Sequence, residues 1–149
     1  MMLYYLMTPV LQEDAIIDLT SNSERFRAFF LEQEGSNKFL RFSKIQFKAQ
    51  EGYTPDNINT VDYLEASIGV PVFSAAFANA LSSVLEKDME LFPCEVDCMG
   101  TNYSFYVGRI LTYSHLVDLE TSEYRLLTDG RRVLRLPKYK REVIDNFLI

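Results

Sequence analysis

The sequence lacks the features that place a chain in a membrane or in an oxidising compartment. No run approaches the roughly 20 apolar residues that a transmembrane helix needs. The apolar N-terminus has no basic lead-in and soon meets Glu13 and Asp14, unlike a secretory signal. The two cysteines, Cys94 and Cys98, cannot build a disulfide framework. We therefore expect a cytoplasmic protein that does not associate with a membrane.

Signatures of phosphate binding and of nucleophilic catalysis are also missing. The six glycines are scattered singly, and none forms a P-loop or a dinucleotide-binding fingerprint. His115 is the only histidine, and no nucleophile elbow or catalytic cysteine motif accompanies it. Cys94, Cys98, Asp97 and Asp118 lack the paired spacing of structural zinc sites. The chain is therefore predicted to have no catalytic residues, no metal and no cofactor.

Carboxylate pairs leave an enzymatic alternative open. Asp62 with Glu65, or Asp118 with Glu120, has the residue types that glycosidases use, although such pairs occur in nearly any acidic chain. One alternative prediction is thus a small hydrolase or nuclease-like enzyme that uses Asp62, His115 or Asp118. A second alternative is a general protein-interaction or scaffold module.

Basic charge is scarce in the middle of the chain. The formal net charge is −6, and residues 61–122 carry two basic and nine acidic side chains. Residues 123–149 reverse the balance, with seven basic and four acidic side chains. A negative chain lacks the basic footprint that nucleic acids require, so we predict no nucleic-acid partner and interpret the cluster at 138–141 as a solvated end. The acidic middle fits either a solvated surface or a docking surface for a basic partner.

Apolar residues are plentiful, at 48% of 149 residues, which is enough to fold one domain over residues 1–149. Its central element is a helix that begins after Ser74 and extends towards Lys87. The Ser74 hydroxyl is a good N-cap, because it can accept a hydrogen bond from a free amide of the first turn. Phe77, Leu81 and Val84 recur at helical spacing and predict a face that packs on the core.

The remaining pattern predicts an α+β domain, in which one or two helices pack on a mostly antiparallel sheet with hairpins in the second half. Ser21 and Glu24 form a capping box, and Pro93 indicates a sheet edge or a bulge. The predicted elements are a strand at 1–7, a helix at 22–34, a strand at 38–48, a loop at 50–60, a strand at 89–97, a turn at 99–102, a strand at 103–111, and a hairpin of 124–128 and 131–136 around an Asp-Gly type I′ turn.

Five segments agree in order and spacing with one protein family. They carry a Pro-Val-hydrophobic-Ser helix start, a Phe-Pro strand and a Val-Asp turn, at 62–64, 69–74, 91–96, 106–111 and 117–124. This pattern resembles the immunity proteins of bacterial polymorphic-toxin systems, a group first described as a domain of unknown function and typified by a myxobacterial protein. The match covers about residues 60–125. Cys94 departs from it, since the family favours an aliphatic residue there. The family also continues beyond a strand similar to 146–149, so both a natural short form and a truncated chain stay open.

The resemblance implies a non-enzymatic protein that binds a cognate toxin effector and blocks it. It supplies no catalytic residues and does not determine whether the chain forms homo-oligomers. A toxin with a basic surface would be attracted by the acidic middle, and tyrosines favour interfaces. The predicted partner-binding residues are Glu86, Asp88, Glu90, Glu95, Asp97, Tyr103 and Tyr106.

Overall fold

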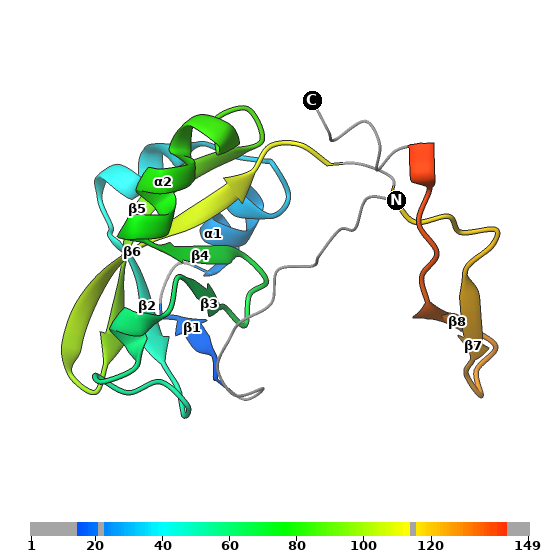
Figure 1. Ribbon diagram of the computed structural model, residues 1–149, viewed down its shortest axis with the longest axis horizontal. Coiled ribbons are helices and arrows are strands. Elements are labelled where there is room, and N and C mark those ends of the chain that lie inside the picture. Colours follow the sequence, from blue (N-terminus) through cyan, green and yellow to red (C-terminus); the bar gives the residue numbers. More distant parts are fainter. Residues whose placement is uncertain (1–14, 21–22, 114–115, 143–149) are drawn as a thin grey trace. The chain divides into compact units, whose positions relative to one another are not determined.

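A computed structural model describes residues 15–20, 23–113 and 116–142 (Figure 1). The chain divides into two compact units, with the boundary between Thr112 and Tyr113. Within the described residues, unit 1 holds a six-stranded sheet and two α-helices, and unit 2 holds a two-stranded sheet. The predicted α+β class is therefore confirmed. No helix in these ranges is long and apolar enough to cross a membrane. The strand predicted at 1–7 lies outside the described residues.

The sheet of unit 1 is antiparallel except for one parallel pair, β2 with β5. Its strand order is β1-β2-β5-β6-β4-β3. The long pair β5–β6 forms the centre and is joined by a turn at Met99 and Gly100, whose φ values of 52° and 89° give the left-handed geometry of a hairpin turn. The strands are β1 (Ile17–Leu19), β2 (Ile45–Ala49), β3 (Tyr63–Glu65), β4 (Pro71–Ser74), β5 (Met89–Cys98) and β6 (Thr101–Ile110).

Helix α1 (Ser23–Phe30) covers one face of this sheet and completes the main core. Its phenylalanines are buried and meet aromatic rings of the strands. The rings of Phe26 and Phe47 are 6.0 Å apart edge to face, and those of Phe30 and Phe92 are 5.4 Å apart. Such ring pairs stabilise beyond the area that they bury, by about 0.5–1.5 kcal/mol each. The phenylalanine-rich sequence of this segment therefore builds the core.

Helix α2 (Ala75–Leu85) begins at Ser74, as predicted. The Phe77 amide donates to Ser74 Oγ at 3.1 Å, and Ser74 Oγ donates to Asp62 Oδ1 at 2.6 Å. Phe77 stacks on Phe73 of β4 with ring centroids 4.9 Å apart. Since Phe73 pairs with Tyr106, on the sheet face opposite Phe92, α2 packs on the other side of the sheet from α1.

The prediction that one face of α2 packs on the core is only partly correct. Phe77 and Leu81 are half-buried, Val84 is 69% exposed, and Ala78 is the only fully buried residue of the helix. The helix contacts the sheet through a short stretch, so its second half projects apolar side chains into solvent. Helical spacing identified the face, but spacing alone does not fix how much of it another layer covers.

Two other sequence predictions needed correction in unit 1. The helix predicted at 22–34 ends at Phe30, and Gln33 and Gly35 then take positive φ. The strand predicted at 38–48 is wrong in its first half, where Ser36 caps a 3-10 helix, η1 (Asn37–Arg41), by accepting from the Lys38 amide. This segment has apolar residues at both odd and even positions, and that pattern is as compatible with a turn as with a strand. The loop at 50–60 is confirmed, with a short 3-10 helix, η2 (Ile58–Thr60), at its end.

Unit 2 contains the predicted hairpin, as β7 (Glu123–Leu126) and β8 (Arg132–Leu136). The type I′ turn is wrong. The Leu127 amide donates to the Arg131 carbonyl and the Gly130 amide donates to the Leu127 carbonyl, which closes a three-residue loop with Gly130 at φ 83°. Three-residue loops place a glycine at the left-handed position, so the Asp-Gly pair serves a different turn from the predicted one.

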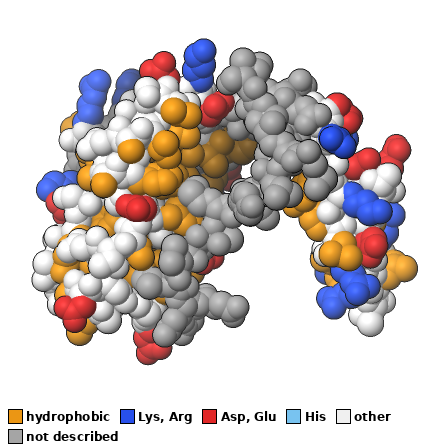
Figure 2. Space-filling view, viewed as in Figure 1, with side chains coloured by type: hydrophobic (Ala, Val, Ile, Leu, Met, Phe, Trp, Pro, Cys, Tyr) orange, Lys and Arg blue, Asp and Glu red, His pale blue; other side chains and the backbone are white. Residues whose placement is uncertain are grey.

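Apolar side chains stand at the surface of this hairpin among arginines (Figure 2). Leu126, Leu134 and Leu136 share a strand face with Tyr124 and are 41–70% exposed. The Arg132 guanidinium lies 4.8 Å from the centre of the Tyr124 ring, a cation–π contact. Every residue of β8 is exposed, so unit 2 derives little stability from burial among its described residues.

Candidate functional site

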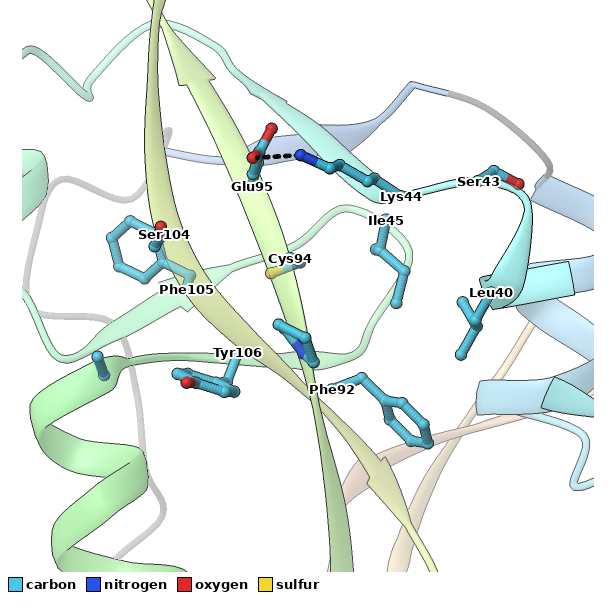
Figure 3. Close-up of a pocket in the computed structure, with 12 residues that line it drawn as sticks. Leu40, Ser43, Lys44, Ile45, Phe92, Cys94, Glu95, Ser104, Phe105 and Tyr106 are labelled. Atoms are coloured by element: carbon cyan, nitrogen blue, oxygen red, sulfur yellow. Dashed lines mark hydrogen bonds and ion pairs between the residues drawn. The ribbon is translucent and has the colours of Figure 1, made fainter. Parts of the chain in front are cut away.

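A groove of about 390 Å³ lies beside β5, between the start of α2 and the start of β2 (Figure 3). In this view Phe92 and Leu40 lie on one side of β5 and Tyr106 on the other. The volume is within the range of sites that hold a small ligand or a protruding side chain. Its walls are largely apolar with a few polar groups, and are formed by Leu40, Ser43, Lys44, Ile45, Ala75, Phe92, Pro93, Cys94, Glu95, Ser104, Phe105 and Tyr106.

The edge of β5 is open beside this groove. Strand β6 pairs with β5 along its whole length, but β2 pairs only with the second half, from Cys94 to Asp97. The first half, Met89 to Pro93, therefore has a sheet neighbour on one side only among the described residues. Pro93 occupies the last position before β2 begins, where its missing N–H leaves no ladder bond unmade. The prediction of an edge at Pro93 thus holds locally, although β5 is central in the sheet.

The free side of β5 presents backbone hydrogen-bonding groups. The Leu111 amide donates to the Asp88 carbonyl at 2.8 Å, which sets the alternation of the β5–β6 ladder. In an antiparallel pair, every second residue bonds to the partner strand and the others point away from it. Residues of even number in β5 therefore face β6. The N–H and C=O of Met89 and Leu91 face the open side.

Acidic side chains gather at the same end of β5. Glu86, Asp88 and Glu90 are exposed at the junction of α2 and β5, and none of them makes an ion pair with another described residue. Glu95 differs, because its Oε1 lies 3.2 Å from Lys44 Nζ at the rim of the groove. The side chain of Lys44 is 80% exposed, so this pair contributes little to stability. The open edge is therefore bordered by three exposed acidic side chains that form no ion pair within the described residues.

The structure separates the predicted partner-binding residues into four locations. Glu95 and Tyr106 both line the groove, and the three acids described above border the open edge. Tyr103 lies on the face that α1 covers and packs against the main core. Asp97 stabilises the β5–β6 turn, because its carboxylate accepts from the Gly100 amide at 2.9 Å. The groove and the open edge thus bring together five of the seven residues.

Both cysteines are buried and free, and they behave as core residues. Burial, reinforced by the charge of Glu95, raises the pKa of the Cys94 thiol to about 12. The Cys98 thiol donates to the Tyr53 carbonyl at 3.6 Å. A thiol with such a pKa stays protonated at neutral pH and is a poor nucleophile. In the part of the chain that the structure describes, no three metal-ligating side chains cluster.

The carboxylates of the enzymatic alternative have local structural roles. Asp62 accepts from the hydroxyl that caps α2. Asp118 accepts from the amides of Glu120 and Thr121 in a turn of unit 2, and hydrogen bonds from Thr121 hold the pKa of Asp118 below its usual value. His115 lies outside the described residues. Asp62 therefore supports a helix cap, and Asp118 stabilises a turn.

Sequence reasoning missed most of the groove. Leu40 and Lys44 fell within a predicted strand, and Ala75 was assigned only to a helix. Ser104 carried no signal of its own. These residues lie up to 66 positions apart, at Leu40 and Tyr106, and only the strand order brings them together. Comparisons with models of protein families, with curated proteins and with solved structures give no match to this chain.

Proposed function

We propose that this chain is an immunity protein, which binds a cognate bacterial toxin and neutralises it without catalysing a reaction. The observation that supports the proposal best is the groove beside β5 with its acidic border. A half-buried tyrosine, Tyr106, stands in an apolar hollow, and Glu86, Asp88 and Glu90 are exposed at the start of β5 without an ion pair to another described residue. Apolar anchors inside a charged border are the usual anatomy of a tight protein interface.

Charge would act mainly on the rate of association. Acidic groups at the border attract a basic surface over distances of about a Debye length, whereas the contacts in the groove resist dissociation. The proposed partner is accordingly a toxin whose contact surface is basic. The chain would bind this toxin in the cytoplasm.

The test begins with a pull-down from lysate of the source bacterium, using the full tagged chain and a high-salt wash. We expect one polypeptide, retained at equal stoichiometry and lethal when it is expressed alone. Co-expression of this chain should restore growth. A retained protein that is harmless, or a lethal one that kills equally in the presence of the chain, would remove the proposal.

Charge reversal tests the acidic border. Glu86→Lys, Asp88→Lys and Glu90→Lys together should slow association by about tenfold or more at low salt, with a smaller effect at high salt. The matched control reverses three exposed acids elsewhere in unit 1, namely Glu24, Glu51 and Asp56. Surface plasmon resonance against the captured toxin measures both. Equal slowing by the two triple variants would show that only net charge matters and that the border has no special role.

A further inference from the structure

The first half of β5 offers two complementary features at one place. The N–H and C=O of Leu91 face away from β6, and β2 does not reach them. The apolar groove begins at the next residue of β5, with Phe92 and Tyr106 in its walls (Figure 3). An unpaired strand edge with an adjoining side-chain pocket is how sheets bind extended peptides, because backbone bonds give affinity and the pocket gives selectivity.

We infer that the partner binds as an extended segment that adds to β5 at Met89 to Leu91, placing one large apolar side chain in the groove and a lysine or arginine against Glu86, Asp88 and Glu90. This inference rests on the proposed function and specifies the part of the toxin that the site takes. Charge complementarity selects the occupant. Between residues 86 and 98 the chain carries five acidic side chains and one basic one.

The length of the added segment follows from the fold. Pro93 has no N–H, and β2 occupies the side of β5 from Cys94 onwards. The incoming segment therefore has backbone partners only at Met89 and Leu91, in line with the alternation of an antiparallel ladder. Two residues of pairing give modest affinity, so most of the selectivity must come from the side chain in the groove.

The test uses a phage-displayed library of random linear nine-residue peptides, selected on the full chain. We expect enriched peptides to share an aromatic or branched apolar residue flanked by lysine or arginine. Ser104→Trp fills the groove from an exposed position of β6 and should weaken these peptides by at least about tenfold. Thr101→Trp, at the exposed first residue of the same strand and outside the groove lining, should leave binding unchanged. Thermal unfolding confirms that both variants remain folded.

Amide exchange supplies the second readout. On binding of an enriched peptide, the amides of Met89 and Leu91 should exchange at least about tenfold more slowly, whereas Glu95 and Asp97, already paired with β2, should not change. Failure to enrich peptides would overturn the inference. So would peptides that bind the Ser104→Trp variant normally, or that leave Leu91 exchange unaltered.

The two proposals fail differently. A chain that rescues cells from the captured toxin but binds no peptide at β5 retains its proposed function and loses the inferred mode of docking. A chain that binds peptides at β5 but retains no lethal protein keeps the edge site and loses the role as an immunity protein.

Discussion

At the scale of single residues, the fold depends on a few close approaches that sequence patterns do not reveal. Gly52 is an example. Its φ is +101°, and a Cβ added there would lie 2.7 Å from the Ala15 side chain and 2.8 Å from the Ala15 backbone. Gly69 also has positive φ, at +82°, but the space around it is open. Substitutions at the two glycines therefore distinguish the cost of backbone strain, which both share, from the cost of steric overlap, which arises only at Gly52.

We predict that Gly69→Ala lowers the free energy of unfolding by about 1 kcal/mol, because alanine is strained at positive φ. Gly52→Ala should cost about 1–3 kcal/mol more, since the added methyl must also displace Ala15. Urea denaturation of both variants measures the difference. If both variants lose the same free energy of unfolding, the segment that contains Ala15 moves aside without an energetic cost.

Because the Cys94 thiol is buried, the free energy of unfolding should vary with pH in the alkaline range. Folding raises its pKa from 9.0 to about 12, so the folded state holds the proton more firmly than the unfolded state. This contribution to stability is fully present below pH 9 and is lost as the pH rises from about 9 to about 12. The free energy of unfolding should therefore fall over that window. Cys94→Ala should show a shallower fall, measured by urea denaturation at a series of pH values. The same slope in both proteins would mean that the thiol is exposed.

At the scale of elements, the N-cap of α2 connects sequence to structure most directly. Ser74→Ala removes the acceptor for the Phe77 amide and the donor to Asp62, and should cost about 1 kcal/mol of unfolding free energy. Ser82 is the control. It lies inside the same helix, where its hydroxyl donates to the Asn79 carbonyl, and Ser82→Ala should be neutral or slightly stabilising. A larger loss from Ser82→Ala than from Ser74→Ala would contradict the capping role.

The N-cap of α2 and the alternation of β5 were parts of the fold that could be read from the sequence. Ser74 marked α2, and the alternation from Met89 marked β5, because both are local effects. Strands β1, β3 and β4 were not foreseen, since three or four residues carry little periodicity. Their place depends on partners far along the chain, such as Phe73 beside Tyr106.

The candidate site was foreseen only in part for the same reason. The acidic charge of residues 86–97 is visible in the sequence, and so is a tyrosine-rich strand. Strand register determines which tyrosine side chain can contact a partner. Register places Tyr106 in the groove and Tyr103 against the core, three residues apart and on opposite faces.

At the scale of the whole molecule, the two units differ in how much they bury. The β5–β6 pair is at the centre of a six-stranded sheet with Val96 and Val107 fully buried, whereas every residue of β8 is exposed. A two-stranded sheet without a covered face is marginally stable in water. The units should therefore open with different free energies.

Hydrogen exchange followed by mass spectrometry measures this difference. Amides of β5 and β6 should be the slowest to exchange, and those of β7 and β8 should exchange at least about a hundredfold faster. Binding of a partner that covers the leucine-bearing face of the hairpin would reduce this difference in exchange rates. Protection in β8 equal to that in β5 in the free chain would show that the hairpin is covered by another surface.

Pro93 has a further consequence for behaviour in solution. An open strand edge invites other copies of the chain to join it, and this is how sheets begin to aggregate. Because the residue carries no amide hydrogen and stands where β2 starts, an added strand cannot grow along β5 beyond two pairing positions. The same proline that leaves room for a partner therefore limits a second copy of the chain to the same two pairing positions along this edge.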